Sequence, residues 1–325
     1  MSEASIAALI AFGGTVALLW LLLGPGRRIA LDRPNRRSLH ERPTPRTGGL
    51  AMLGGAGAAA LTLPWLPPMD LALAFAVLVA VSLLDDFRGM PVVIRFPCHL
   101  IAAGWAAVSI LGASHGVLVA GFAALAIAWM INLYNFMDGS DGMAGGMALA
   151  GFGAFAWLAA GADPALHAAA LILAAAAAAF LLFNVPPARI FMGDTGSTSL
   201  GFFAGVLSLY GWQHGVWSPW VAAVVFSPFL LDATLTLLRR ILMRDRFWEA
   251  HRDHYYQRLI RMGWSHRRTA LAAWAVMLAA GLLAVAIARW EAIPQALAAC
   301  AWYALLCAML GAIELRWRGH SAARE

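Results

Sequence analysis

The sequence predicts an all-α integral membrane protein, a polytopic bundle of about eleven transmembrane helices, and two observations carry this prediction. First, 62% of the 325 residues are hydrophobic, 12% are charged, and the mean hydropathy is +0.72. Soluble domains carry about a quarter charged residues, so this composition excludes a soluble protein. Second, the 23 basic residues are all arginine and gather between apolar stretches, which are long enough to cross a bilayer core that needs about 20 helical residues.

The arginine clusters divide the apolar stretches, and each stretch is predicted to be one span. The predicted spans, in chain order, are 4–24, 48–64, 70–84, 92–112, 116–134, 146–160, 165–183, 198–212, 218–238, 269–289 and 294–315. An odd number of crossings places the two termini on opposite sides. Alternating the loops puts every arginine except Arg289 on one side, which the positive-inside rule makes cytoplasmic. We therefore expect an external N-terminus and a cytoplasmic C-terminus.

The chain is predicted to be a single domain, 1–325, whose site is built from loops on the arginine-rich side. The opposite loops are short and nearly uncharged. The loops that hold the polar chemistry are about 25–47, 85–91, 132–145, 184–197 and 239–268. Carboxylates, carboxamides, glycines and arginines together suit a phosphate bridged by a metal ion, because carboxylates beside an anionic ligand need a cation to offset their repulsion.

Two adjacent acids, Asp85 and Asp86, close the third predicted span. A solvated helix end would explain an isolated acidic pair. Acids at a helix C-terminus oppose the macrodipole, however, so we expect compensation by Arg88 or by a bound cation.

Polar side chains recur at every third position between the fifth and sixth spans, at Asn132, Asn135, Asp138 and Asp141. On one continuous helix the first and last would face opposite ways. Gly139 and Gly142 therefore predict a break that lets Asn135, Asp138 and Asp141 converge. The alternative is a plain polar turn, which would not need asparagines at membrane depth.

One further acid, Asp194, is surrounded by glycines and hydroxyl residues at the start of the eighth span. Thr195 and Ser197 can cap that helix. A helix N-terminus beside a carboxylate also fits Mg²⁺ together with phosphate. From this segment alone both interpretations stay open.

His251 and His254 lie one turn apart if that segment is helical. No further ligands with zinc-site spacing are near, so contact with an anionic substrate is the functional interpretation and solvated loop histidines are the alternative. Asp232 lies inside the ninth span, where an unpaired acid is costly. We expect it either to pair with a buried base such as Arg95 or His99 or to line a groove for a lipid phosphate.

Five sequence blocks, in this order, resemble the polyprenyl-phosphate N-acetylhexosamine-1-phosphate transferases (glycosyltransferase family 4 type). That family includes initiators of O-antigen, common antigen and teichoic acid linkage, and the muramoyl-pentapeptide translocase. The blocks are Asp32–His40 with Pro43–Gly49, Leu84-Asp85-Asp86, Asn132–Gly146, Phe183–Gly201, and His251-Arg252-Asp253-His254-Tyr255-Tyr256-Gln257-Arg258-Leu259. Phe87-Arg88 follows the acidic pair where some relatives carry a lysine a few residues on. The last block resembles the O-antigen and capsule initiators rather than the muramoyl enzyme, which favours a UDP-N-acetylhexosamine as donor.

The resemblance implies transfer of an N-acetylhexosamine 1-phosphate from a UDP-sugar to undecaprenyl phosphate, with release of UMP, in the bacterial cytoplasmic (inner) membrane and with the active site facing the cytoplasm. It implies Mg²⁺ (or Mn²⁺) bound by Asn135 and Asp194. The implied catalytic residues are Asp85, Asp86, Asp138 and Asp141. The implied substrate-binding residues are Asn35, Ser38, His40, Asn132, Asn184, His251, Arg252 and His254.

The role of Asp85 and Asp86 as base, nucleophile or positioning group stays open; we favour direct attack by the acceptor, because a phosphate monoester has a second pKa near about 6. Expected partners are the two substrates and membrane lipid, with no nucleic acid, and a homodimer is an open possibility. The alternative function is a transporter of a nucleotide-sugar or organic anion. Transporters place polar groups near the bilayer midplane, whereas here the acids cluster at one interface.

Overall fold

The computed structural model describes residues 1–26, 29–32, 43–65, 67–246 and 251–322, and over these residues the chain is a bundle of twelve helices with one short β ribbon. In chain order the helices are α1 (Glu3–Leu23), α2 (Gly48–Ala60), α3 (Met69–Arg88), α4 (Val92–Met137), α5 (Met143–Ala159), α6 (Pro164–Asn184), α7 (Gly193–Gln213), α8 (Pro219–Val225), α9 (Ser227–Leu242), α10 (Tyr255–Arg261), α11 (His266–Ile287) and α12 (Ala292–Ala322). Strands β1 (Leu31–Asp32) and β2 (Thr44–Pro45) pair antiparallel, with Leu31 opposite Pro45.

Every predicted span falls in a helical region, and all but the ninth fall on a single helix, so the all-α polytopic membrane fold is confirmed. Five helices, α1, α4, α6, α11 and α12, are long and apolar enough to cross a membrane, and the bent pair of α8 and α9 would make a sixth. Two predicted spans, 92–112 and 116–134, lie on α4, which changes direction at Gly116, where φ is 76°. The number of crossings and the orientation stay predictions.

The ninth predicted span, 218–238, is broken. Helices α8 and α9 meet at an angle of 77°, and Phe226 between them caps both. Pro228 stands in the first turn of α9, where its missing N–H cannot continue the hydrogen bonding of α8. The polar helix α10 was not predicted, because its sequence, YYQRLIR, has no apolar run.

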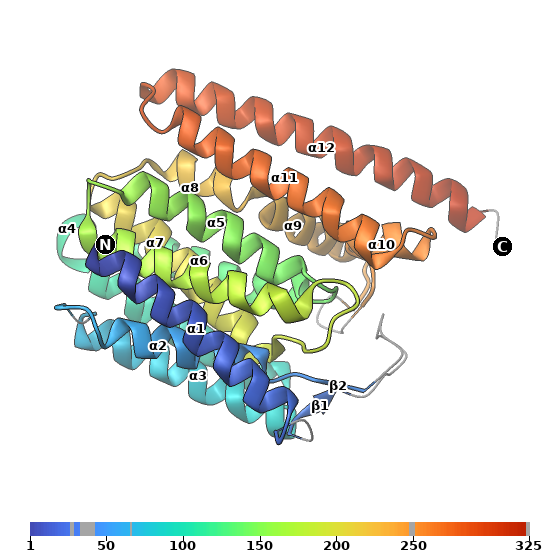
Figure 1. Cartoon of the computed structure of the whole chain (residues 1–325). Coiled ribbons are helices and arrows are strands. Elements are labelled where there is room, and N and C mark those ends of the chain that lie inside the picture. Colours follow the sequence, from blue (N-terminus) through green and yellow to red (C-terminus); the bar gives the residue numbers. More distant parts are fainter. Residues whose placement is uncertain (27–28, 33–42, 66, 247–250, 323–325) are drawn as a thin grey trace.

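Helix α7 lies inside the bundle, in contact with α2, α3, α4, α5, α6 and α8. Small residues permit this close packing, as is typical of membrane helices. A Cβ on Gly201 would fall 2.4 Å from the backbone oxygen of Met130, and one on Gly196 would fall 2.7 Å from Cα of Gly49. Helix α12 lies along the outside, and it ends at the opposite end of the molecule from the start of α1 (Figure 1).

Candidate active site

Carboxylates from three helix ends meet at one end of the bundle. Asp85 and Asp86 lie in the last turn of α3, Asp138 follows the end of α4, and Asp194 is the second residue of α7. Asp86 accepts hydrogen bonds from the backbone N–H groups of Asp194 and Thr195, both at 2.9 Å, and from the Thr195 hydroxyl at 2.6 Å. Asp86 is therefore the side chain that caps α7, and it fixes the position of Asp194.

Arg95 connects two acids of the cluster, Asp85 and Asp194. Nη1 of Arg95, in the first turn of α4, donates to Oδ2 of Asp85 and to Oδ2 of Asp194, the latter at 2.6 Å. On the other side of the cluster Arg46 donates to the backbone oxygen of Asp86. The compensation expected from Arg88 or a cation is thus provided in this structure by Arg95 and Arg46; Arg88 is exposed.

Backbone contacts hold this cluster together. The N–H groups of Gly48 and Gly49 donate to the carbonyls of Phe191 and Met192 at 2.9 and 2.8 Å. Gly193 has φ +74°, and a Cβ there would lie 2.4 Å from the backbone oxygen of Arg46. Only glycine fits this position, because other residues both resist positive φ and would collide with the 46–49 segment.

Burial and the negative charges of the cluster raise the pKa values of two of its carboxyl groups, Asp138 and Asp194. The four carboxylates lie outside the predicted spans. Burial raises the pKa of Asp138 well above its usual range, and the charges of Asp194, Asp86 and Asp141 raise it further. Burial, a hydrogen bond with Asp85 and the charge of Asp86 raise the pKa of Asp194 to about 7.

Asp85 behaves differently from its neighbours. Burial would raise the pKa of Asp85, but hydrogen bonds with Asp194 and the Met90 N–H, together with Arg95, outweigh it, so that the pKa is lowered. Asp85 is therefore ionised, and both its oxygens already accept hydrogen bonds, from Met90 and Arg95.

The donor set fits a hard divalent cation. In addition to burial, neighbouring carboxylates raise the pKa values of Asp138 and Asp194, as expected where a positive charge would stabilise the site. Among the described residues no group of three or more His, Cys, Asp and Glu side chains is arranged to hold a metal, so a cation would complete its shell with amide, water or phosphate oxygens, which is usual for Mg²⁺. Asn135, half-buried and one turn before Asp138 on α4, can supply such an oxygen.

The predicted break after α4 is confirmed, and two polar side chains hold the loop that follows it. Gly142, with φ 72°, precedes α5. Asn184 is buried; it accepts from the Gly142 N–H and donates to the Ile190 carbonyl, both at 2.8 Å. Asp141 accepts from the Ala188 N–H at 2.9 Å. Both side chains tie the 138–142 loop to the 185–190 loop, and their predicted roles toward substrate are not tested.

Asp232 pairs with a histidine that belongs to the predicted site. Its Oδ1 lies 3.1 Å from Nδ1 of His254 and accepts from the Tyr255 N–H at 3.1 Å, while Oδ2 accepts from the Tyr256 N–H at 3.3 Å. The expected pairing of this buried acid is found, but the partner is not Arg95 or His99, because Arg95 binds Asp85 and Asp194. Asp232 instead holds the start of α10.

The histidine segment (His251–His254) lies beside the end of α4. The ring of His254 stacks on Phe136 with centroids 6.3 Å apart, and the Tyr256 hydroxyl donates to the Phe136 carbonyl at 3.4 Å. Burial and the neighbouring His254 and Arg240 lower the pKa of His251 to about 4. The structure thus brings this segment to the same end of α4 as Asp138, with His251 neutral.

Two of the remaining predicted residues make hydrogen bonds within the protein, and the other three lie outside the described residues. Asn132 donates to the Ala128 carbonyl of its own helix at 2.7 Å, and Arg252 accepts at its backbone oxygen from Arg261 at 3.0 Å. Asn35, Ser38 and His40 lie outside the described residues.

Sequence reasoning missed Arg95 as a member of the site. A lone arginine inside the predicted span 92–112 is costly in a membrane, and that signal could have identified it.

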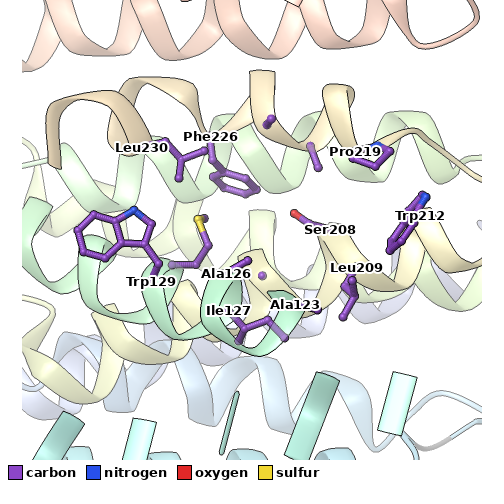
Figure 2. A pocket seen from close by; sticks show the side chains of 14 residues that line it. Ala123, Ala126, Ile127, Trp129, Ser208, Leu209, Trp212, Pro219, Phe226 and Leu230 are labelled. Carbon is purple, nitrogen blue, oxygen red and sulfur yellow. The ribbon is translucent and has the colours of Figure 1, made fainter. Parts of the chain in front are cut away.

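An apolar cavity of about 230 Å³ lies between α4, α7, α8 and α9. Figure 2 shows Phe226 and Leu230 on one side of it, facing Trp129 and Ile127 on the other. Its lining residues are Ala123, Ala126, Ile127, Trp129, Met130, Gly205, Ser208, Leu209, Trp212, Pro219, Ala222, Ala223, Phe226 and Leu230.

Known proteins resemble the chain over most of its length. Residues 69–212 match the family model described as glycosyl transferase family 4. The chain is 28% identical to a probable undecaprenyl-phosphate N-acetylglucosaminyl 1-phosphate transferase of Bacillus subtilis, covering 83% of this chain and 82% of that protein. It is 31% identical to a decaprenyl-phosphate N-acetylglucosaminephosphotransferase of Mycobacterium tuberculosis, covering 80% and 77%. It is 30% identical to a phospho-N-acetylmuramoyl-pentapeptide-transferase of Moorella thermoacetica, covering 83% and 96%.

Proposed function

The chain belongs to glycosyl transferase family 4, and from this premise we propose that it transfers an N-acetylhexosamine 1-phosphate from a UDP-sugar to undecaprenyl phosphate. The product is a lipid-linked diphosphosugar that starts a cell-surface polysaccharide, and UMP is released. The observation that carries the proposal is the meeting of Asp85, Asp86, Asp138 and Asp194 with Arg46 and Arg95 at one end of the bundle. Two polyanions that must react there need their charge neutralised and their phosphates aligned.

The chemistry is a direct displacement. An oxygen of the lipid phosphate attacks the sugar-linked phosphorus, and the bond from that phosphorus to the bridging oxygen breaks. The bridging oxygen leaves with UMP. The acceptor needs no strong base, because a phosphate monoester is largely dianionic at neutral pH.

The environment of Asp85 supports direct attack over two alternatives. A carboxylate with a lowered pKa is a weak base, and one that already accepts hydrogen bonds at both oxygens is a poor nucleophile. Asp85 instead holds Arg95, whose guanidinium would orient the incoming phosphate. We expect UDP-sugar alone to release no stoichiometric burst of UMP.

A divalent cation, Mg²⁺ or Mn²⁺, would neutralise the diphosphate and the leaving UMP when bound. Asp194 and Asn135 would hold it. Asp86 keeps Asp194 in place by capping α7. Asp138 and Asp141 shape the surroundings of the nucleotide and cation, and His251, Arg252 and His254 contact the diphosphate or the sugar.

The apolar cavity is suited to the prenyl chain of the acceptor. Its lining is almost entirely hydrocarbon. The lining residue Met130 lies five positions before Asn135 on α4, roughly 7.5 Å along a helix axis. A short part of the lipid tail in the cavity would therefore lie against the same helix that carries the proposed cation ligand Asn135. We place the cluster at the cytoplasmic face of the bacterial inner membrane, from the asymmetry of the arginines.

The test is an assay of the purified protein with undecaprenyl phosphate, Mg²⁺ and a panel of UDP-sugars, beginning with UDP-N-acetylglucosamine. We expect UMP release and a lipid-linked product that both depend on acceptor and cation. UDP-sugar uptake into vesicles without UMP release would replace this proposal with a transporter. Release of UMP without acceptor would overturn the direct displacement.

A further inference from the structure

Helix α10 directly follows the histidine segment, and it is too short to be stable without contacts to the rest of the protein. It has seven residues, about two turns, and isolated helices shorter than about 12 residues are marginal in water. Its location must therefore come from tertiary contacts. At its start these are the hydrogen bonds to Asp232.

The middle of α10 is held by an ion pair to α12. The side chain of Arg258 is fully buried, and its Nη1 donates to Oε2 of Glu314. The guanidinium also lies over the rings of Tyr255 and Trp317, 5.1 and 5.7 Å from their centroids. A buried guanidinium without its carboxylate would be an uncompensated charge, so the position of Arg258 depends on Glu314.

Glu314 also forms ion pairs with two further arginines. Its Oε1 lies 2.9 Å from Nε of Arg318 and 3.6 Å from Nη2 of Arg239, at the end of α9. It therefore connects α9, α10 and α12 at a single carboxylate. Arg318 is 68% exposed, so that pair adds little, whereas the pair with Arg258 is shielded from water.

The length of α12 explains how Glu314 reaches this place. The helix has 31 residues, about 46 Å at 1.5 Å per residue, whereas about 20 residues cross the bilayer core. Its last turns extend beside α10 (Figure 1). The predicted span 294–315 includes Glu314, and α12 continues beyond it to Ala322.

From these contacts we propose that Glu314 is a positioning residue for the transfer reaction, which acts through Arg258 to hold the histidine segment against the end of α4. The proposal rests on the proposed function, because the segment is assigned there to the diphosphate or sugar. The proposal makes Glu314 a determinant of donor binding although it lies on α12, away from the acidic cluster.

The experiment compares Glu314→Gln and Glu314→Ala with Arg316→Ala, an exposed residue of the same extension. We expect both Glu314 variants to raise the KM for the UDP-sugar by about tenfold or more, the effect expected when a buried charge pair is broken. The KM for the acceptor should stay near the wild-type value and kcat should fall less than KM rises. Arg316→Ala should match wild type. Hydrogen exchange of residues 255–261 should accelerate in the Glu314 variants, while exchange in α11 stays unchanged.

A charge-free pair tests whether the effect runs through Arg258. Replacing both partners, as Arg258→Leu with Glu314→Leu, removes the buried charge, and apolar replacements of buried ion pairs are often well tolerated. The double variant should recover donor KM relative to Glu314→Leu alone. Unchanged exchange in α10 and unchanged donor KM in Glu314→Gln would overturn the proposal, as would a double variant no better than the single. If wild type makes no product while α10 still loosens in Glu314→Gln, the proposed function fails and the structural link between Glu314 and α10 stands.

Discussion

The acidic cluster and the histidine segment are held in place by different means. Around Asp86 and Asp194, backbone hydrogen bonds between the 46–49 segment and the start of α7, and glycines that allow α2 and α7 to touch, add to the side-chain contacts of Asp86 and Arg95. The histidine segment and α10 are held by side-chain contacts, among them those of Asp232 at the start of α10 and Glu314 at its middle. Under the proposed function, the acidic cluster would act on the phosphates and the histidine segment would contact the diphosphate or the sugar.

The largest expected effect on transfer comes from changing the proposed cation ligand of the acidic cluster, Asp194. Asp194→Asn keeps the shape of the side chain and removes its charge. We expect transfer to fall by about a thousandfold, the scale of losing one key electrostatic contact in a reaction centre. Acceptor-dependent UMP release measures this, with insertion and monodisperse elution as evidence that the protein is intact.

A matched control is Asp163→Asn. Asp163 accepts from the Leu166 N–H at 2.9 Å at the start of α6, a role that asparagine fills equally well. Its activity should equal that of wild type. Robust transfer by Asp194→Asn would remove the cation assignment from Asp194.

The fold and the acidic cluster could be predicted because their signals are local. Apolar runs mark the helices, and acids at helix ends mark Asp85, Asp138 and Asp194. The partners of these acids could not be predicted, since Arg95 reaches Asp194 only after α4 packs on α7. The same reason explains the wrong partners for Asp232: His254 lies 22 residues further along the chain, directly before α10, and no sequence spacing relates the two residues.

The next largest effect is expected at Gly193. Comparing alanine at Gly193 with alanine at Gly161 separates the cost of backbone strain from the cost of steric collision. Gly193 and Gly161 have similar φ values, +74° and +77°, but a Cβ would meet Arg46 and Asp86 at Gly193 and nothing within 4 Å at Gly161. Alanine at either site costs about 1–2 kcal/mol of left-handed strain. At Gly193 it must also push the 46–49 segment away from α7.

We therefore expect Gly193→Ala to lower both the unfolding temperature and the transfer rate, and Gly161→Ala to lower the unfolding temperature slightly with normal activity. Thermal unfolding in detergent and the UMP assay measure the two quantities. Equal behaviour of the two variants would mean that the close contact at Gly193 does not position the acidic cluster.

The smallest expected effect concerns the pH dependence of the histidine segment. The pKa of His251 is about 4 in the folded protein, against an ordinary value of 6.5. Between these pH values the unfolded chain binds a proton that the folded chain does not, so stability rises with pH in this window. The contribution is complete above about 6.5 and is lost as pH falls toward 4, at no more than about 1.4 kcal/mol per pH unit.

His251→Gln should remove this dependence, so the difference in unfolding temperature between wild type and variant should shrink or reverse from pH 7 to pH 5. Arg252→Gln is the control, because arginine does not titrate in this range. A difference between wild type and His251→Gln that stays constant with pH would show that His251 is not held neutral beside α4.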